Sequence, residues 1–468
     1  MNIKILVSIL LLVISQEPGS AQSSSPNFIL ILTDDHGWTS TSTAMDQKVP
    51  NSKSDYFETP GIDRLASQGM RFSHGYAPAA LCTPTRRSIL YGQTAIRQGT
   101  EESFPAKYHP DQHDFITIPL MLKKTNPAYK AAHFGKFHLQ GNFFPEEIGY
   151  DESDGDTNNS GGNMFEYKED KWMKTFFSGD PKKADHITGR GINFIKRCVE
   201  DGNPFYLQLS HYATHVDIQS KADTYKKYSS KPRGTVHDHP GYAGMLDHMD
   251  ASIGRVLDFV EAQGISGNTY IILLADNGGV EFIPPSSDKM NHPDQNPRKQ
   301  RNYPLRGGKW VLYEGGIRVP FIIKGPGVKP GSQCDVAATG YDLLPTLADL
   351  VGYREQMPAY IDGGSLKPLL EKGDGEVSRA EDALFFHRYA GSYPHSAVIQ
   401  DGYKLIKLWR SKNQTESIEL YSLKNDLGEL YNLASEMPEK AAKMEQLLME
   451  YMRKVNPELV QDLMVKLN

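Results

Sequence analysis

Four short, almost continuous apolar runs punctuate the chain, and longer amphipathic segments lie between them. The apolar runs lie at 27–33, 205–210, 269–275 and 319–324. Runs of this length suit strands that are buried on both faces of a parallel sheet. Apolar residues at helical spacing occur at 63–68, 84–91, 184–199 and 242–263. Strands that alternate with helices predict an α/β domain with a mainly parallel sheet, sandwiched by helices.

The pattern changes after a polar, glycine-containing stretch at 371–381. Short strand-like runs follow at 383–386, 396–400, 403–409 and 418–422, and an amphipathic segment then covers 438–455. Strands this close in sequence predict a small antiparallel sheet, with one helix after it. We therefore expect a large α/β domain at 22–375 and a smaller α+β domain at 376–468.

The N-terminus has the order of a secretory signal. Lys4 precedes the apolar run 5–14, and the small residues Gly19, Ser20 and Ala21 follow it. A charged start, an apolar centre and small residues at the end are typical of a signal peptide, here 1–21. The apolar run is shorter than the ~20 residues that a membrane span needs. We expect an exported protein, periplasmic or secreted, without a membrane span.

Composition narrows the possible partners. The chain has 51 Lys and Arg against 57 Asp and Glu, which gives a net charge of −6 and a pI of about 6.2. A mildly acidic chain lacks the basic footprint of a nucleic-acid binder. Three cysteines in 468 residues exclude a disulfide scaffold. The oligomeric state cannot be predicted from these features.

Acidic pairs directly follow two of the apolar runs. Asp34 and Asp35 come after 27–33, and Asp276 and Asn277 come after 269–275. Ligands of open α/β sheets bind at the carboxyl ends of strands. Three carboxylates and an amide oxygen gathered there would favour Ca²⁺ or Mg²⁺ over Zn²⁺. Alternatively, each pair only begins a loop or caps a helix.

Cys82 and Arg86 combine a nucleophile with a cation. Pro84 suits the first turn of a helix and Thr83 suits its N-cap, so Cys82 would lie at a helix N-terminus that favours anions. Arg86 follows four positions later and can share a helix face with Cys82. This arrangement suits attack on sulfate or phosphate. The simpler interpretation is a buried, inert cysteine.

Further protonatable side chains could complete such a site. Lys136 and His138 stand at alternate positions, on one side of an extended segment. His215 follows the run at 205–210, and Lys309 lies in a glycine-rich segment. A lone lysine or histidine is usually solvated, so the prediction of a site depends on all of these residues together.

Cys82-Thr-Pro-Thr-Arg86 resembles the activation motif of type I, formylglycine-dependent sulfatases. Thr85 replaces the commoner Ser of that motif. The resemblance continues through Thr33-Asp34-Asp35, Gly135-Lys136-Phe137-His138, Ala275-Asp276-Asn277 and Gly308-Lys309, and it extends to Asp342–Thr346 and to Glu419. Phe137 replaces a commoner Trp. In order along the chain, these motifs cover nearly all of the mature protein.

The resemblance implies the alkaline-phosphatase-like fold with a smaller C-terminal domain. It implies that a maturation enzyme oxidises Cys82 to formylglycine, whose hydrate attacks sulfur. Arg86 and Lys136 would hold the hydrate and the sulfate charge, and His138 would be the base that later expels sulfate. The Ca²⁺ ligands would be Asp34, Asp35, Asp276, Asn277 and residue 82. His215 and Lys309 would contact sulfate, and one of them would protonate the leaving alcohol, with His favoured by its ordinary pKa of about 6.5.

The resemblance also suggests the substrate. Exported sulfatases most often act on sulfated glycans, and the segments 210–217 and 302–305 are similar to bacterial exo-acting glycan sulfatases, some of which remove 4-O-sulfate from galactose or N-acetylgalactosamine. Specificity would reside in two long polar stretches, 141–171 and 281–304. The candidate substrate-binding residues are His211, Asn302, Arg306, His387 and Arg388. Each of these could equally serve loop packing or a solvated face.

Two other functions compete with this one. A phosphodiesterase or phosphonate hydrolase of the same superfamily can share the cysteine motif, but Asp276-Asn277 here lacks a following metal-site His. A non-catalytic glycan-binding relative would have no reason to retain the complete charged set. Conversion of Cys82 would leave Cys198 and Cys334, which could pair in an oxidising compartment or remain two buried thiols.

Overall fold

The computed structural model describes residues 25–99, 115–162, 174–281, 301–389, 393–412 and 414–465. The predicted signal peptide lies outside these residues, as do parts of both long polar stretches. The large domain contains a sheet of eight strands in the order β11-β2-β10-β9-β1-β7-β4-β5. The strands of this sheet are β1 (Asn27–Thr33), β2 (Met70–Phe72), β4 (Lys130–Gly135), β5 (Glu152–Ser153), β7 (Phe205–Ser210), β9 (Thr269–Ala275), β10 (Phe321–Lys324) and β11 (Ser332–Cys334).

The sheet is mainly parallel, as the apolar runs predict. β9, β1, β7, β4 and β5 run parallel, whereas β10 runs antiparallel to both β9 and β2. The apolar runs of β1, β7 and β9 begin and end where the sequence predicts them. All residues of these three strands are buried, which explains why they carry no alternation of apolar and polar side chains.

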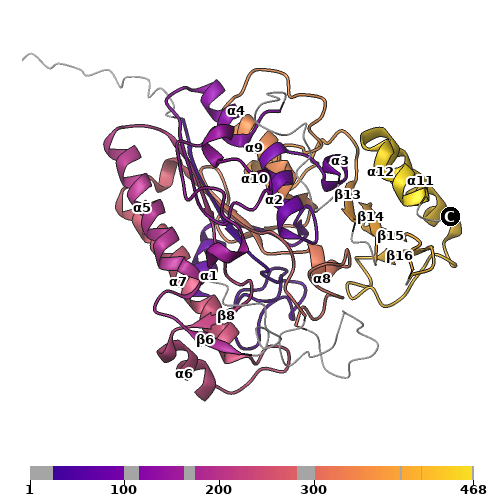
Figure 1. The fold of residues 1–468 in the computed structure, drawn as a ribbon, viewed down its shortest axis with the longest axis horizontal. Coiled ribbons are helices and arrows are strands. Elements are labelled where there is room, and N and C mark those ends of the chain that lie inside the picture. Colours follow the sequence, from indigo (N-terminus) through magenta and orange to yellow (C-terminus); the bar gives the residue numbers. More distant parts are fainter. Residues whose placement is uncertain are drawn as a thin grey trace, which may run out of the picture.

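Helices cover both faces of this sheet (Figure 1). One face packs against α1 (Pro60–Gln68), α5 (Ala184–Glu200) and α7 (Pro240–Ala262). The opposite face packs against α2 (Cys82–Tyr91), α4 (Ile118–Thr125), α9 (Leu343–Leu350) and α10 (Lys367–Lys372). Alternate residues of β1 separate these cores: Ile29 and Ile31 face the first set of helices, and Phe28, Leu30 and Leu32 face the second.

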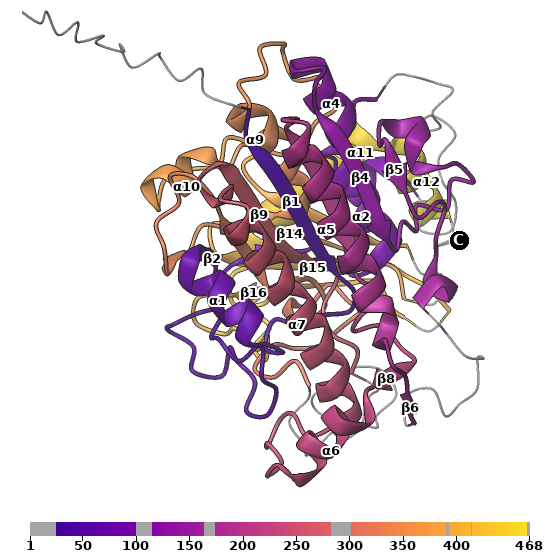
Figure 2. The same cartoon turned by 90° about the vertical axis from the view of Figure 1, so that its left-hand side faces the viewer.

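Short elements fill the loops of the large domain. They are α3 (Ala95–Gln98), α6 (Ala222–Ser230), α8 (Glu314–Ile317), β3 (Gly75–Tyr76), β6 (Thr175–Phe177), β8 (Ile218–Ser220) and β12 (Ala338–Thr339). β3 pairs with β12, and β6 pairs with β8. Figure 2 looks through α5 and α7 onto the sheet, and it shows β6 and β8 beside the start of α5.

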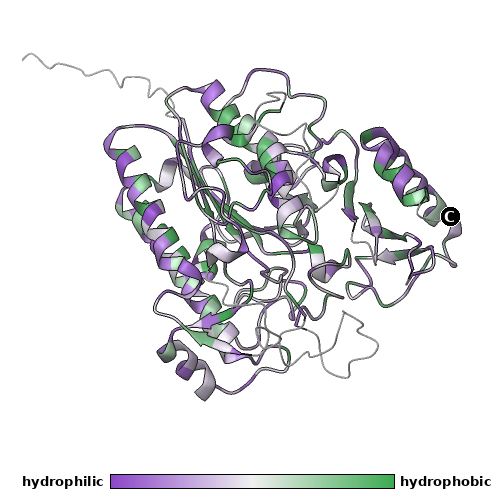
Figure 3. Cartoon of the chain, in the orientation of Figure 1, coloured by the Kyte–Doolittle hydropathy of each residue, from purple (hydrophilic) through white to green (hydrophobic). Residues whose placement is uncertain are grey.

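The C-terminal part forms the antiparallel sheet that the sequence predicts. Its strands are β13 (Leu384–Arg388), β14 (His395–Gln400), β15 (Tyr403–Leu408) and β16 (Ser417–Ser422), paired in that order. α11 (Pro438–Val455) covers one face, together with a helix that the periodicity did not reveal, α12 (Pro457–Val465). The other face packs on the large domain through Tyr76, Ile317 and Tyr341. Apolar segments therefore lie at the centre of each part, and polar segments lie outside (Figure 3).

Candidate active site

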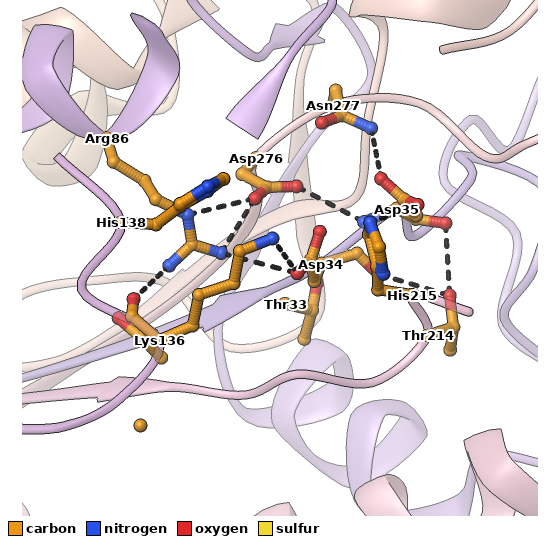
Figure 4. Close-up of polar contacts among 12 residues, drawn as sticks. Thr33, Asp34, Asp35, Arg86, Lys136, His138, Thr214, His215, Asp276 and Asn277 are labelled. Carbon is orange, nitrogen blue, oxygen red and sulfur yellow. Dashed lines mark hydrogen bonds and ion pairs between the residues drawn. The ribbon is translucent and has the colours of Figure 1, made fainter. Parts of the chain in front are cut away.

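The strand order explains why distant residues meet. β9, β1, β7 and β4 are parallel neighbours, so the residues that follow them lie at one edge of the sheet. Asp276 follows β9, Asp34 follows β1 and Lys136 follows β4. His215 lies in the loop after β7. All four side chains are buried. The structure thus places the sequence-predicted residues of these loops around a common centre (Figure 4).

Three carboxylates and three cations form ion pairs at this edge. We call this group, made of Asp34, Asp35, Asp276, Arg86, Lys136 and Lys309, the strand-end cluster. Arg86 donates from Nε and Nη2 to Oδ2 of Asp276, at 3.1 and 2.7 Å. Lys136 donates to Oδ2 of Asp34. Lys309 lies 2.8 and 3.0 Å from the two carboxylate oxygens of Asp35. Each cation therefore has a carboxylate partner, and the cluster is balanced in formal charge.

Burial and neighbouring charges set the protonation of these acids. Burial alone would raise the pKa of Asp34, but Lys136, His215 and Arg86 outweigh it and lower the pKa well below its usual value. Burial raises the pKa of Asp35 despite Lys309. Burial and the charge of Asp34 raise the pKa of Asp276 to about 6. The charges of Asp34 and Asp276 oppose each other's ionisation, and a divalent cation between them would offset this repulsion.

The donor set fits a hard cation. Asp34, Cys82 and Asp276 offer ligand atoms that all lie within 4.8 Å of one another. Oδ1 of Asp34 and Oδ1 of Asn277 are buried, and neither has a hydrogen-bond partner among the described residues. A buried oxygen without a partner costs free energy, unless something absent from the protein itself completes its contacts. Oxygen ligands of this kind suit Ca²⁺ or Mg²⁺.

Cys82 begins α2, as predicted, but Thr83 is not the N-cap. Leu81 occupies the cap position, and no side chain caps the helix. The hydroxyl of Thr83 instead lies 3.3 Å from Nδ1 of His138. The helix starts two residues before Pro84, so the side chain of Thr83 belongs to the first turn and turns towards the site. Burial raises the pKa of the Cys82 thiol, although Lys136 and Lys309 act against it.

Gly135 turns the chain after β4. Its φ is +97°, and a Cβ there would lie 2.0 Å from the carbonyl oxygen of Ser210, so only glycine fits. His138 also has a positive φ, of +54°. The segment from Lys136 to His138 is therefore a loop and not the extended strand that the sequence suggested. The side chains of Lys136 and His138 still both reach the site, because the turn directs them there without the alternation of an extended strand.

His215 lies on the opposite side of Asp34 and Asp276 from Arg86 and His138 (Figure 4), and Lys309 contacts Asp35. Nδ1 of His215 lies 2.7 Å from the carbonyl oxygen of Val216, which requires a proton on Nδ1. Nε2 then faces Oδ2 of Asp35 at 3.9 Å. The loop that carries Lys309 comes close to the end of β9, where a Cβ on Gly278 would lie 1.8 Å from the carbonyl oxygen of Gly315.

The five candidate substrate residues differ in the contacts that they make. The side-chain amide of Asn302 donates to Gly279, Glu281 and Gly307. Arg306 stacks on Tyr313 at 3.9 Å and donates to Tyr421 and to the carbonyl of Glu429. These contacts hold loops together.

His387 and Arg388 lie in β13, and His387 is hydrogen-bonded to Ser396 at 2.8 Å. His211 directly follows β7. It is buried, and neither of its ring nitrogens has a partner within the described residues.

Sequence reasoning missed two buried residues near the strand-end cluster. Lys182 and Asp217 are both buried, and the charges of both Asp217 and Asp34 act on the ammonium group of Lys182. A lysine in a polar stretch has no sequence signal for burial, whereas Asp217 lies only two positions after His215.

Cys198 and Cys334 are not paired with each other. All three cysteines are free and buried. Burial raises the pKa of Cys198 to about 12. The alternative of two inert buried thiols therefore holds in this structure.

Comparison with known proteins points in the same direction. The family profile described as Sulfatase matches residues 26–353, and the profile described as N-sulphoglucosamine sulphohydrolase, C-terminal, matches residues 308–458. A sulfatase from Formosa agariphila is 29% identical over 517 aligned residues, which cover 91% of this chain and 88% of that protein. Human N-acetylgalactosamine-6-sulfatase is 28% identical, covering 85% of this chain and 74% of its own.

Solved structures share the architecture. The crystal structure of Ps i-CgsB in complex with k-i-k-neocarrahexaose superimposes with a TM-score of 0.73 at 23% identity, covering 92% of this chain and 93% of that chain. A likeness at this level of identity establishes the fold. No helix within the described ranges combines the length and apolarity that crossing a membrane requires.

Proposed function

The chain belongs to the sulfatase family and hydrolyses sulfate esters, and we propose that it does so with a formylglycine at position 82 and one Ca²⁺. The observation that carries this proposal is the meeting of Asp34, Cys82 and Asp276 within 4.8 Å at the carboxyl ends of parallel strands. The unpartnered oxygens of Asp34 and Asn277 support a bound cation.

Asp34, Asp35, Asp276 and Asn277 would hold the Ca²⁺ together with residue 82. The bound ion would polarise a sulfate oxygen and ease deprotonation of the attacking hydroxyl. Oxidation of Cys82 to formylglycine, followed by hydration, would supply that hydroxyl. The high pKa of the unmodified thiol supports this order of events, because a buried neutral thiol is a poor nucleophile.

The remaining residues bind the sulfate and move protons. Arg86 and Lys136 are held between the carboxylates, where their positive charges stabilise the sulfate group. His138, whose Nδ1 lies 3.3 Å from the hydroxyl of Thr83, is placed beside residue 82 to act as the base that expels sulfate.

His215 would protonate the leaving alcohol from Nε2 in its doubly protonated form, because the proton on Nδ1 is engaged by the carbonyl oxygen of Val216. Lys309 contacts the sulfate in this arrangement and is the alternative proton donor. Burial lowers the pKa of Lys309, but the charges of Asp35, Cys82 and Asp34 together raise it above its usual value, which makes Lys309 the weaker acid of the two.

We propose an exo-acting enzyme on sulfated glycans, with galactose or N-acetylgalactosamine 4-O-sulfate as the substrate unit. The human relative named N-acetylgalactosamine-6-sulfatase supports a galacto-configured sugar. The solved complex with a neocarrahexaose supports a carbohydrate ligand for this fold. His211 is the candidate sugar contact whose ring nitrogens are both left without a partner among the described residues.

Export and maturation complete the proposal. The charged, apolar and small-residue order of 1–21 supports secretion to the periplasm or the medium. A formylglycine-generating or equivalent enzyme would act on Cys82 as the maturation partner.

The mass of the peptide that contains residue 82 tests the chemistry. Conversion of Cys82 to the aldehyde changes this mass in a defined way, and an unmodified thiol in fully active protein would contradict the proposal. Matched sulfate, phosphate and phosphonate esters should then be compared. Faster turnover of phosphate or phosphonate esters would favour the competing hydrolase function.

Regiodefined sugars test the substrate. We expect 4-O-sulfated galactose or N-acetylgalactosamine at a chain end to be hydrolysed faster than the 6-O-sulfated isomers and faster than internal units of a polymer. Preference for internal sulfates would refute exo action, without touching the proposed chemistry at residue 82.

A further inference from the structure

A tight turn before α5 directs one lysine inward and leaves the next one partly exposed. Lys182 and Lys183 have φ values of +56° and +54°. The left-handed region is uncommon for residues other than glycine, and two such residues in a row are maintained only by the surrounding structure. Lys182 is 1% exposed.

Several contacts hold this turn in place. The backbone N–H of Lys182 donates to the side-chain oxygen of Gln219 at 2.9 Å. The carboxylate of Asp180 accepts from the backbone N–H groups of Asp185 and His186, at 2.8 and 3.1 Å. His248 of α7 approaches Asp180 at 3.3 Å. The position of Lys182 is therefore determined by contacts with β8, α5 and α7, and not by its own side chain.

The ammonium group of Lys182 differs from the cations of the strand-end cluster. Arg86, Lys136 and Lys309 each contact a carboxylate directly. For Lys182, no ion pair and no hydrogen bond of the side chain occurs with any residue in the described part of the chain. An ammonium group that forms no ion pair within the protein can bind an anionic ligand.

Lys182 lies beside the segment that follows His215, because its backbone N–H donates to Gln219, four residues after His215. Burial lowers the pKa of Lys182 to about 7, while the charges of Asp217 and Asp34 act in the opposite direction. The pKa of His215 is lowered by burial and by the charges of Lys309, Lys136 and Lys182. His215 is on the side of the carboxylates away from Arg86 (Figure 4), which is where the leaving alcohol would be protonated.

We propose that Lys182 binds a second anionic group of the substrate, a sulfate or a carboxylate carried on the leaving side of the scissile sulfate. Arg86, Lys136 and Lys309 already serve the scissile sulfate. Lys182 is buried, is held by a rigid turn and has no partner within the described residues. This inference rests on the proposed sulfatase chemistry and narrows its substrate to sugars with more than one negative charge. Lys182 is in this sense a specificity-determining residue.

Binding in the full-length Cys82→Ser protein tests the inference without turnover. The probes are a galactose or N-acetylgalactosamine monosulfate, the corresponding disulfate, and the monosulfate linked to a uronic acid. Because a second anionic group adds a hydrogen bond between charged partners, we expect the better of the two dianionic sugars to bind at least roughly tenfold tighter than the monosulfate. The identity of the better sugar distinguishes a sulfate from a carboxylate.

Three variants in this background separate specificity from folding. Lys182→Met should reduce the preference to less than about threefold, and Lys182→Arg should restore most of it. Lys183→Met is the matched control and should keep the full preference. The Tm of Lys182→Met should be unchanged or higher, because removing an unpaired buried charge does not destabilise the fold.

An equal preference in Lys182→Met and in the parent would overturn the inference, as would a parent that binds all three sugars alike. Turnover by the matured enzyme is measured in parallel. If it hydrolyses no sulfate ester, the proposed chemistry fails and the inference fails with it. If the matured enzyme hydrolyses the monosulfate but the preference for a dianionic sugar does not depend on Lys182, only the inference fails.

Discussion

Two of the buried charge clusters in the described part of the chain are built differently. The strand-end cluster lies at the carboxyl ends of β1, β4 and β9. The second, which we call the interdomain cluster, comprises Glu314, Arg318, Lys404 and Glu429. Lys404 of β15 lies 2.8 Å from Glu314 and 2.6 Å from Glu429, and Arg318 lies 3.1 Å from Glu314. It joins the C-terminal sheet to α8 of the large domain.

The difference lies in what the carboxylates still lack. Lys404 is enclosed by two carboxylates and the carbonyl oxygen of Leu312 at 3.0 Å, all from segments that this contact ties together. Oε1 of Glu429 has no hydrogen bond of good geometry but lies 2.6 Å from Lys404, whereas Oδ1 of Asp34 in the strand-end cluster, like Oδ1 of the neighbouring Asn277, has no hydrogen-bond partner among the described residues. Burial and charge therefore do not by themselves mark a functional site. What marks the strand-end cluster is that ligand atoms of Asp34, Cys82 and Asp276 lie within 4.8 Å of one another.

Removing the nucleophile should give the largest effect and should spare stability. Cys82→Ala in the matured enzyme is expected to lower turnover of a sulfate ester by at least about 10³-fold. The loss of one small side chain at a helix start should leave the Tm within a few degrees of the parent. Steady-state kinetics and thermal unfolding measure the two effects. Retention of a tenth of the activity would contradict the role of residue 82.

Breaking the interdomain cluster should lower the stability of the protein and leave its activity intact. Lys404→Met leaves the carboxylates of Glu314 and Glu429 buried together without their shared cation, which should cost about 3–5 kcal/mol of stability. The activity per folded molecule should persist, because Lys404 lies outside the strand-end cluster. Denaturant unfolding measures the loss of stability.

Lys407 of the same strand supplies the control. It pairs with Glu416 and Glu445, whose side chains are 36% and 32% exposed. Lys407→Met should cost only about 1 kcal/mol, since water can solvate the partners that remain. Equal costs for the two lysines would show that the interdomain cluster has no special role in stability.

The sequence predicts the backbone of the strand-end cluster well. Asp34 and Asp276 follow runs that are apolar throughout, and such runs indicate parallel strands whose carboxyl ends meet. Cys82 and Arg86 follow from helical spacing. These signals are local, which is why the bounds of β1, β7, β9 and α11 agree with the prediction.

Other features depend on contacts that are distant in sequence. The antiparallel direction of β10 and the register of the C-terminal sheet against the large domain have no local pattern. Lys182 is buried by a turn of two left-handed residues, which a sequence of polar residues does not reveal. Arg306 reads as a candidate sugar contact, although its contacts with Tyr313 and Tyr421 fasten one domain to the other.

The stabilisation of the fold by Ca²⁺ should distinguish the strand-end cluster from the interdomain cluster. In wild type, Ca²⁺ at 100 times its Kd should stabilise the fold by about 2.7 kcal/mol. Asp276→Asn removes a charged ligand and should abolish most of this gain, together with activity. Asp335→Asn, a carboxylate 43% exposed and paired with Lys48, is the control. Thermal unfolding with and without Ca²⁺ measures the gain, and an unchanged gain in Asp276→Asn would exclude that residue as a ligand.

The smallest predicted effect is the pH dependence of stability, and it concerns Glu429 of the interdomain cluster. Burial and the charge of Glu314 raise the pKa of Glu429 to about 7, although Lys404 opposes this. The folded protein therefore holds a proton that the unfolded chain releases near pH 4.5, so this contribution to stability is full below pH 4.5 and is lost as pH rises to 7. The Glu429→Gln variant lacks this pH-dependent contribution to stability.

The stability of wild type minus that of Glu429→Gln should therefore fall by about 2 kcal/mol between pH 5 and pH 7. Glu58, at the surface, gives the opposite sign: hydrogen bonds from Lys227 and Lys231 lower its pKa. Its contribution is present above its unfolded pKa and is lost as pH falls, so Glu58→Gln should matter least in acid. Denaturant unfolding at several pH values measures both slopes. Slopes of the same sign would mean that ionised Glu429 is stabilised by Lys404 as a simple pair, and the interdomain cluster would then differ from a surface ion pair only in burial.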